Sequence, residues 1–97
     1  MLPIRSFIVK GHSMQPSLSE GDHILVNKWA YLFSRPKVGD VVVFKSINEG
    51  KYILKRIQKI ATQGLIVRGD NKVDSADSSF FGIIKPEQVL GRFLTKY

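Results

Sequence analysis

The feature that most restricts the fold of this chain is its regular spacing of glycine turns. Gly-Asp pairs stand at residues 21–22, 39–40 and 69–70, and further glycines stand at positions 50, 64, 82 and 91. Between them lie short segments rich in β-branched and aromatic residues: FIV (7–9), HILVN (23–27), VVVFK (41–45), YILKRIQKIA (52–61), LIVR (65–68) and QVLGRFLTKY (88–97). Such segments are typical of β strands joined by tight turns. The sequence therefore predicts a mainly β fold with a small barrel-like or sandwich-like core.

Length and composition indicate one domain that spans residues 1–97. Hydrophobic residues make up 43% and charged residues 24% of the chain, which are the proportions of an ordinary folded domain. Helix is expected only as a turn within residues 27–35, before Pro36. The chain has no cysteine and two histidines, which excludes disulfides and thiolate sites and leaves no pattern for a metal centre.

The formal net charge of +7 favours anionic partners, either nucleic acid or an acidic membrane surface. The cationic residues are spread along the whole chain, which argues against sequence-specific DNA binding, and no nucleic-acid partner is expected. No apolar run approaches the ~20 residues of a membrane-spanning helix, and the first residues do not form a secretory signal. These absences favour a cytoplasmic location.

The stretch KGHSMQPSL (10–18) raises the question of a nucleophilic serine, because Ser13 directly follows His12. Successive side chains of an extended chain point to opposite faces, so His12 is poorly placed to act as a base for Ser13. His23 follows a Gly-Asp turn and could approach in space, but a Ser-His-Asp site would then rest on two isolated residues. The remaining interpretation is a polar turn between strands.

Lysine is the other side chain able to activate a serine. A lysine base must be neutral near pH 7, whereas its ordinary pKa is about 10.4, and burial among apolar groups is what lowers that pKa. Lys55 is the best candidate, because Ile53 and Ile57 share its strand face under the period-two alternation of a strand. Most lysines are solvated, so a surface role for Lys55 stays open.

A third polar segment, GDNKVDSADSSFFG (69–82), ends in two aromatic residues. Turns made by Asp and Asn side chains explain such a composition as a surface loop. The length of the segment and its aromatic end are unusual for a simple connector. Its acidic spacing does not match the calcium loop of EF-hands, so no calcium site is predicted.

Together these segments resemble the signal peptidase I family, the serine–lysine peptidases of the S26 type. GHSMQPSL is similar to the nucleophile box of that family, and GDHILVNKWAY and RPKVGDVVVFK resemble the segment that follows it. YILKRI is similar to the lysine box and GDNKVDSADSSFFG to the final box. The motifs keep the order of the family over nearly the whole chain. The implied fold is the β-rich catalytic core that is also related to SOS-type repressor proteases.

The resemblance implies a role for each matching residue. Ser13 is the acyl-enzyme nucleophile, and its backbone N–H is one oxyanion donor. Lys55 is the general base. Ser75 positions the lysine amine, and Asp77 is a structural acid whose ion-pair partner is Arg56.

Two positions depart from the pattern of the family. Gly11 stands where some members carry a hydroxyl side chain, so the second oxyanion donor is unassigned. Ser79 stands where an arginine is common, which reduces the salt-bridge network. Asp70 and Asn71 are expected to be structural.

The activity that the resemblance implies is removal of N-terminal signal or leader peptides after small residues, through an acyl-enzyme and without metal or cofactor. The partner is then an extended peptide or preprotein with small residues before the cut. It would pair with strand edges around residues 9–13 and 53–56.

Members of the family are anchored by N-terminal membrane helices, and this sequence contains none. Three explanations fit: a truncated catalytic domain, peripheral membrane contact through WAYLF (29–33) and the positive charge, or a soluble relative. The last group includes short proteases proposed to trim the propeptide of nickel superoxide dismutase. SOS-type repressors are a different class, but no helix-turn-helix segment fits here. A non-catalytic peptide-binding module is the remaining alternative.

Overall fold

The computed structural model describes residues 3–46, 50–71 and 80–97. These ranges contain a short helix, α1 (Ala30–Phe33), a 3-10 turn, η1 (Pro86–Gln88), and strands that make up most of the regular secondary structure. The strands are β1 (Ile4–Ile8), β2 (His23–Asn27), β3 (Val41–Lys45), β4 (Tyr52–Ala61), β5 (Gly64–Arg68), β6 (Phe80–Ile84) and β7 (Val89–Lys96). The prediction of a mainly β fold is confirmed.

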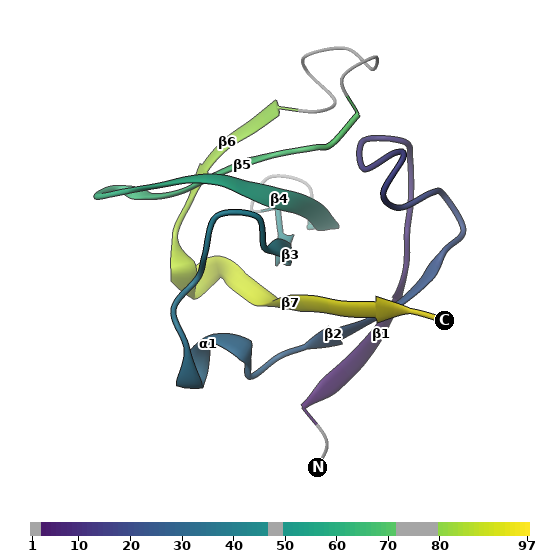
Figure 1. The fold of residues 1–97 in the computed structure, drawn as a ribbon, viewed down its shortest axis with the longest axis horizontal. Helices are drawn as coiled ribbons and strands as arrows, with labels where there is room; N and C mark the ends of the chain where they lie inside the picture. Colours follow the sequence, from purple (N-terminus) through teal and green to yellow (C-terminus); the bar gives the residue numbers. More distant parts are fainter. Residues whose placement is uncertain (1–2, 47–49, 72–79) are drawn as a thin grey trace.

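The strands form one antiparallel sheet in the order β1-β2-β7-β3-β4-β5-β6. β7 is the last strand along the chain, yet it lies between β2 and β3. Figure 1 shows β1, β2 and β7 on one side of the molecule and β4, β5 and β6 on the other, with β3 between them. The central position of β3 and β7 therefore joins two halves that come from different parts of the sequence.

Strand β3 shows how the sheet forms two cores. Val41–Phe44 are all buried, as expected for a strand covered on both faces. Alternate side chains point to opposite faces. Val41 and Val43 belong to a first core with Val9, Met14, Leu18, Ile24 and Val26. Val42 and Phe44 belong to a second core with Ile57, Leu65, Val67 and Ile84.

Two glycines that look like turn residues in the sequence lie inside strands. Gly82 lies within β6, where its φ of 121° is unfavourable for other residues. Gly91 lies within β7, where a Cβ atom would stand 2.6 Å from both the Asn27 carbonyl oxygen and Val26 Cγ1. The interpretation of residues 69–82 as one loop is thus wrong at its end, because β6 begins at Phe80.

The helical turn expected within residues 27–35 is present as α1. The Asn27 side chain accepts a hydrogen bond from the Trp29 backbone N–H at 2.9 Å, and Ser34 Oγ donates to the Ala30 carbonyl at 2.8 Å. Ala30 is buried, whereas Leu32 and Phe33 are 68% and 85% exposed. None of the helices in the described ranges has the length and apolar character needed to cross a membrane.

Candidate active site

The segment that carries Ser13 is a compact turn between β1 and β2. Hydrogen bonds from Val9 N–H to the Asp22 carbonyl and from Gly21 N–H to the Val9 carbonyl, both 2.9 Å, close its base. Inside the turn the Leu18 N–H donates to the Met14 carbonyl at 2.9 Å. The side chains of both residues are buried in the first core. The buried side chains of Met14 and Leu18 therefore attach this polar surface turn to the first core.

Gly11 lies at the entry of this turn, with a φ of 75° that favours glycine. Its backbone N–H donates to Glu20 Oε2 at 2.9 Å. No atom lies within 4 Å of the place where its Cβ would stand. The turn therefore needs glycine here for its backbone conformation and not for lack of space.

Ser13 is partly exposed and lines an apolar pocket of about 160 Å³. One wall of the pocket comes from β4, through Ile53 and Leu54. Strand β1 and the residues after it, from Phe7 to Lys10, contribute another wall. The pocket thus joins the two segments that the sequence singled out as a substrate groove.

Lys55 follows Leu54 on β4 and is only 6% exposed. It stands opposite the buried Val42 of β3 in the register of the two strands. Its neighbours on the same face of β4 are Ile53 and Ile57, both of which pack in the second core. The apolar burial expected of Lys55 is present, and the strand that carries it also walls the pocket of Ser13.

Arg56, next to Lys55, forms an ion pair with Asp70. Its Nε lies 2.9 Å from Oδ1 and its Nη2 lies 2.8 Å from Oδ2. These hydrogen bonds hold the pKa of Asp70 below its ordinary value, against the opposing effect of burial, and the Ser17 hydroxyl lowers it further by donating at 2.7 Å. The hydrogen bonds with Asp70 also raise the pKa of Arg56, against the opposing effect of burial. Asp70 therefore joins β4, the strand that carries Lys55, to the turn that carries Ser13.

Asn71 makes a second connection between the same two parts. Its backbone N–H donates to the carbonyl of Ser13 at 2.9 Å, and its Nδ2 donates to the carbonyl of His12 at 2.8 Å. We call Asp70 and Asn71, with these contacts, the clasp. The clasp fixes the backbone of Ser13 directly, so the structural role expected for both residues is present.

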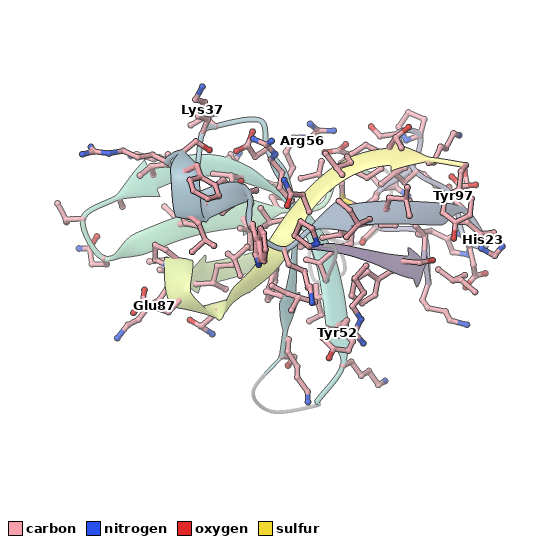
Figure 2. All side chains as sticks on the ribbon, turned by 90° about the horizontal axis from the view of Figure 1, so that it is seen from below. His23, Lys37, Tyr52, Arg56, Glu87 and Tyr97 are labelled. Atoms are coloured by element: carbon pink, nitrogen blue, oxygen red, sulfur yellow. The ribbon has the colours of Figure 1, made fainter. Side chains whose placement is uncertain are left out.

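The histidines occupy separate places. His12 is exposed, and its Nδ1 lies 3.1 Å from Nε2 of Gln15. His23, at the start of β2, packs its ring against Tyr97, with 5.6 Å between the ring centroids (Figure 2). Among the described residues no three His, Asp or Glu side chains come together as a metal site.

The remaining predicted site residues, Ser75 and Asp77, lie outside the described residues, as does Ser79. The expected pairing of Arg56 with Asp77 thus stays a prediction. The pairing of Arg56 with Asp70 was missed by sequence reasoning. The sequence feature that could have indicated it is the Gly-Asp pair at residues 69–70. This pair directly follows β5, in which Arg68 lies opposite Arg56, so the carboxylate comes close to Arg56.

A model of the family described as signal peptidase, peptidase S26, matches residues 1–64 of the chain. The chain belongs to this family. It is 24% identical to signal peptidase I of Leptolyngbya laminosa over an alignment of 148 residues that covers 99% of this chain and 72% of that protein. That alignment is longer than the 97-residue chain, so the relative contains inserted segments that are missing here.

Two other relatives have a higher sequence identity over a smaller share of this chain. The chain is 32% identical to a Staphylococcus aureus protein named inactive signal peptidase IA, over 78% of this chain and 49% of that protein. It is 33% identical to the probable signal peptidase I of Mycobacterium leprae, over 87% of this chain and 28% of that protein. The chain therefore spans about half or less of the length of these two relatives.

Proposed function

We propose that this S26 family member is a serine endopeptidase that removes N-terminal signal or leader peptides after small residues. Ser13 is the nucleophile and Lys55 the general base. The observation that carries the proposal is the burial of Lys55 on the strand that walls the pocket lined by Ser13. Apolar burial is the physical means of keeping a lysine neutral near pH 7.

The reaction is acyl transfer. Neutral Lys55 Nζ takes the proton of the Ser13 hydroxyl as Oγ attacks the scissile carbonyl carbon. The oxyanion accepts a hydrogen bond from the Ser13 backbone N–H, and the C–N bond breaks as Lys55 returns the proton to the leaving amine. Lys55 then deprotonates a water that attacks the ester, which releases the carboxyl product and restores Ser13.

Three further residues support this site in the proposal. Ser75 positions the Lys55 amine by hydrogen bonding. Arg56 and Asp77 support the site structurally, and Asp70 already binds Arg56. The rigid placement of groups within a few tenths of an ångström is what makes such a dyad effective.

The substrate would bind as an extended peptide against strand edges. Strand β4 pairs with β3 from Tyr52 to Arg56, but its pairing with β5 begins only at Arg56. Within the described residues, the other edge of β4 before Arg56 therefore has no partner strand. The 160 Å³ pocket beside this edge is the size for small apolar side chains.

Two alternative functions differ from signal peptide removal. One differs in its substrate, and the other differs in having no catalytic activity. A dedicated processing protease would trim one propeptide, such as that of a nickel superoxide dismutase. A peptide-binding module would bind the same extended segment and leave it uncut. The name of the S. aureus relative shows that this family includes proteins described as inactive.

The deciding experiment compares cellular protein N-termini in cells with the wild-type chain and with Ser13→Ala. Accumulated secretory precursors would support signal peptide processing, and a single uncut propeptide would support a dedicated maturase. Identical N-termini, together with full cleavage of a model peptide by purified Ser13→Ala, would contradict the serine mechanism.

We also propose that the segment around α1 contacts an anionic membrane surface. It exposes Trp29, Leu32, Phe33 and Val38, and the cationic Lys28, Arg35 and Lys37 lie among them. Exposed aromatic residues next to lysine and arginine suit the interface of an acidic bilayer. Sedimentation with phosphatidylglycerol vesicles should fall several-fold for Phe33→Ser. Equal sedimentation of both proteins would contradict the contact.

A further inference from the structure

A second hollow, separate from the pocket of Ser13, lies where β4 and β5 meet the turn that carries Ser13. Its volume is about 750 Å³, and among the described residues it shares no lining residue with that pocket. Arg56, which lines the hollow, and Tyr52, which lines the pocket, lie on opposite sides of the molecule (Figure 2). Arg56 also points to the opposite face of β4 from Lys55, because successive side chains of a strand alternate. The hollow is therefore distinct from the proposed catalytic groove, and its volume suits a small ligand.

Two arginines face each other across the strands that border this hollow. Arg56 of β4 lies opposite Arg68 of β5 in the register of the two strands, and both residues line the hollow. The Cβ atoms of residues directly opposite each other on one face of an antiparallel pair stand about 5 Å apart, and like charges at such positions repel. Negative charge is needed to offset this repulsion.

The negative charge that the structure places here offsets only one of the two arginines. Asp70 binds Arg56 through Nε and Nη2, and the same carboxylate accepts a hydrogen bond from Ser17. Arg68 is exposed and forms no ion pair with any residue of the ranges 3–46, 50–71 and 80–97. These side chains therefore leave the hollow with an excess of positive charge, centred on Arg68.

Both guanidinium groups have donors that point to a ligand with several oxygens. A guanidinium carries five N–H groups. Arg56 uses three of them in hydrogen bonds to described residues, two to Asp70 and one to the Gly39 carbonyl at 2.7 Å. The other two, together with the guanidinium of Arg68 and the side-chain amide of Gln58, border the hollow. A phosphate group accepts hydrogen bonds from two guanidinium groups at once, and each bond is strengthened by charge.

We propose that this hollow binds a phosphate group between Arg56 and Arg68, with Arg68 as its main contact. The inference is independent of the proposed peptidase activity, because Arg56 and Lys55 face opposite sides of β4. Two sources of phosphate fit this chemistry, a phosphate ion in solution and the headgroup of an anionic lipid. Val38, in the segment that we propose to contact a membrane, also lines the hollow, so a headgroup at that surface lies next to it.

The first test measures binding of inorganic phosphate by isothermal titration calorimetry, with chloride added to keep the ionic strength constant. The wild-type chain should bind phosphate at a single saturable site. Arg68→Gln should weaken the affinity about tenfold, because it removes the main contact. Arg68→Lys keeps the charge but loses the two parallel donors, so its affinity should lie between those of the other two proteins. Absence of saturable binding to the wild type would overturn the proposal.

Asp70→Asn should change the affinity in the opposite direction. The substitution removes a negative charge that repels the phosphate and that occupies Arg56. The affinity for phosphate should therefore rise several-fold, measured at a temperature at which circular dichroism shows the variant to be folded. A lower affinity in the folded variant would overturn the placement of the phosphate beside Arg56.

Arg5→Gln is the matched control, because it removes one arginine charge from β1, which is far from β5 in the order of the sheet. At this separation salt screens the charge, so the affinity for phosphate should stay within about twofold of the wild-type value. Equal losses in Arg5→Gln and Arg68→Gln would show a general effect of net charge and overturn the proposal.

Sedimentation with phosphatidylglycerol vesicles distinguishes the two sources of the phosphate. If the lipid supplies it, Arg68→Gln should sediment several-fold less than the wild type, and inorganic phosphate at constant ionic strength should release the wild type. If the ligand is the phosphate ion, both proteins should sediment equally while the calorimetric difference remains. Reduced sedimentation of Arg68→Gln, without saturable phosphate binding by the wild type, would indicate diffuse attraction to the membrane and contradict the site.

Discussion

Arg56 and Asp70 form a two-bonded ion pair that joins β4 to the residues after β5, with N–O distances of 2.9 and 2.8 Å. Arg56 also donates to the Gly39 carbonyl at 2.7 Å, and Ser17 donates to the Asp70 carboxylate at 2.7 Å. One carboxylate therefore connects three segments that are far apart in the sequence. The side chain of Asp70 is 16% exposed, so water screens the pair only in part.

Replacement of Asp70 by Asn should lower the free energy of unfolding by about 1–2 kcal/mol near pH 6. Because Arg56 and Ser17 hold the pKa of Asp70 below its ordinary value, the stabilisation is fully present above the unfolded pKa of about 3.9. It is lost as the pH falls through the lower folded pKa. Urea unfolding of wild type and Asp70→Asn from pH 6 to pH 2.5 should therefore show a difference that shrinks with acid.

The control for this measurement is Glu87→Gln, on the exposed turn η1 (Figure 2). It should change the free energy of unfolding by less than about 0.5 kcal/mol at any pH. A loss for Asp70→Asn that stays constant down to pH 2.5 would show that the charge of Asp70 is not what stabilises the fold.

Asn71→Ala removes the hydrogen bond to the His12 carbonyl but keeps the backbone donor to Ser13. We expect kcat to fall about tenfold, because the backbone next to Ser13, the proposed nucleophile, loses the hydrogen bond from the Asn71 side chain. The free energy of unfolding should fall by about 1 kcal/mol. Peptide cleavage under conditions where both proteins are fully folded checks the kinetic part. An unchanged kcat would show that the backbone hydrogen bond alone positions Ser13.

Lys55→Ala and His12→Ala should behave oppositely. Loss of Lys55 should abolish cleavage while the fold is retained, because it removes the proposed general base of Ser13. Loss of the exposed His12 should change the rate by no more than about twofold. Circular dichroism and cleavage of one peptide by both variants check this pair. Full activity of Lys55→Ala, or loss of activity in His12→Ala, would contradict the serine–lysine assignment.

The rate of cleavage should rise from pH 6 towards an alkaline optimum, because a lysine base acts only after it loses its proton. The profile of kcat/KM between pH 6 and pH 10 is the measurement. Separate unfolding data over the same range exclude a change in the folded population. A rate that does not vary with pH would argue against Lys55.

Gly91→Ala should destabilise the fold because the added methyl group would clash with β2. The new Cβ would stand 2.6 Å from the Asn27 carbonyl and from Val26 Cγ1, both on β2. We expect a loss of about 2–3 kcal/mol and a decrease in Tm of about 10 °C. Thr95→Ala, at an exposed position of the same strand, should change Tm by only a few degrees. Equal effects of the two substitutions would show that β2 moves aside at little cost.

Most strands of this fold were predictable because they are short β-branched segments next to a glycine. β6 was missed because it follows a polar segment and contains Gly82, which is unfavourable in the interior of a strand. The burial of Lys55 followed from alternation along β4. The pairing of Arg56 with Asp70 could not be predicted in the same way. Which carboxylate reaches Arg56 depends on the path of the chain after β5. The insertion of β7 between β2 and β3 is a long-range pairing that no local pattern specifies.

The place of β7 bears on when the molecule becomes active during its own synthesis. β2 and β3 are joined in the sheet through β7, which the ribosome makes after all the other strands (Figure 1). The clasp that holds Ser13 also follows Lys55 in the sequence. A growing chain that has emerged as far as β6 therefore carries both proposed catalytic residues without the strand that unites their halves. We expect the proposed peptidase activity to appear only after β7 has emerged from the ribosome. Neighbouring nascent chains would then be protected from premature cleavage.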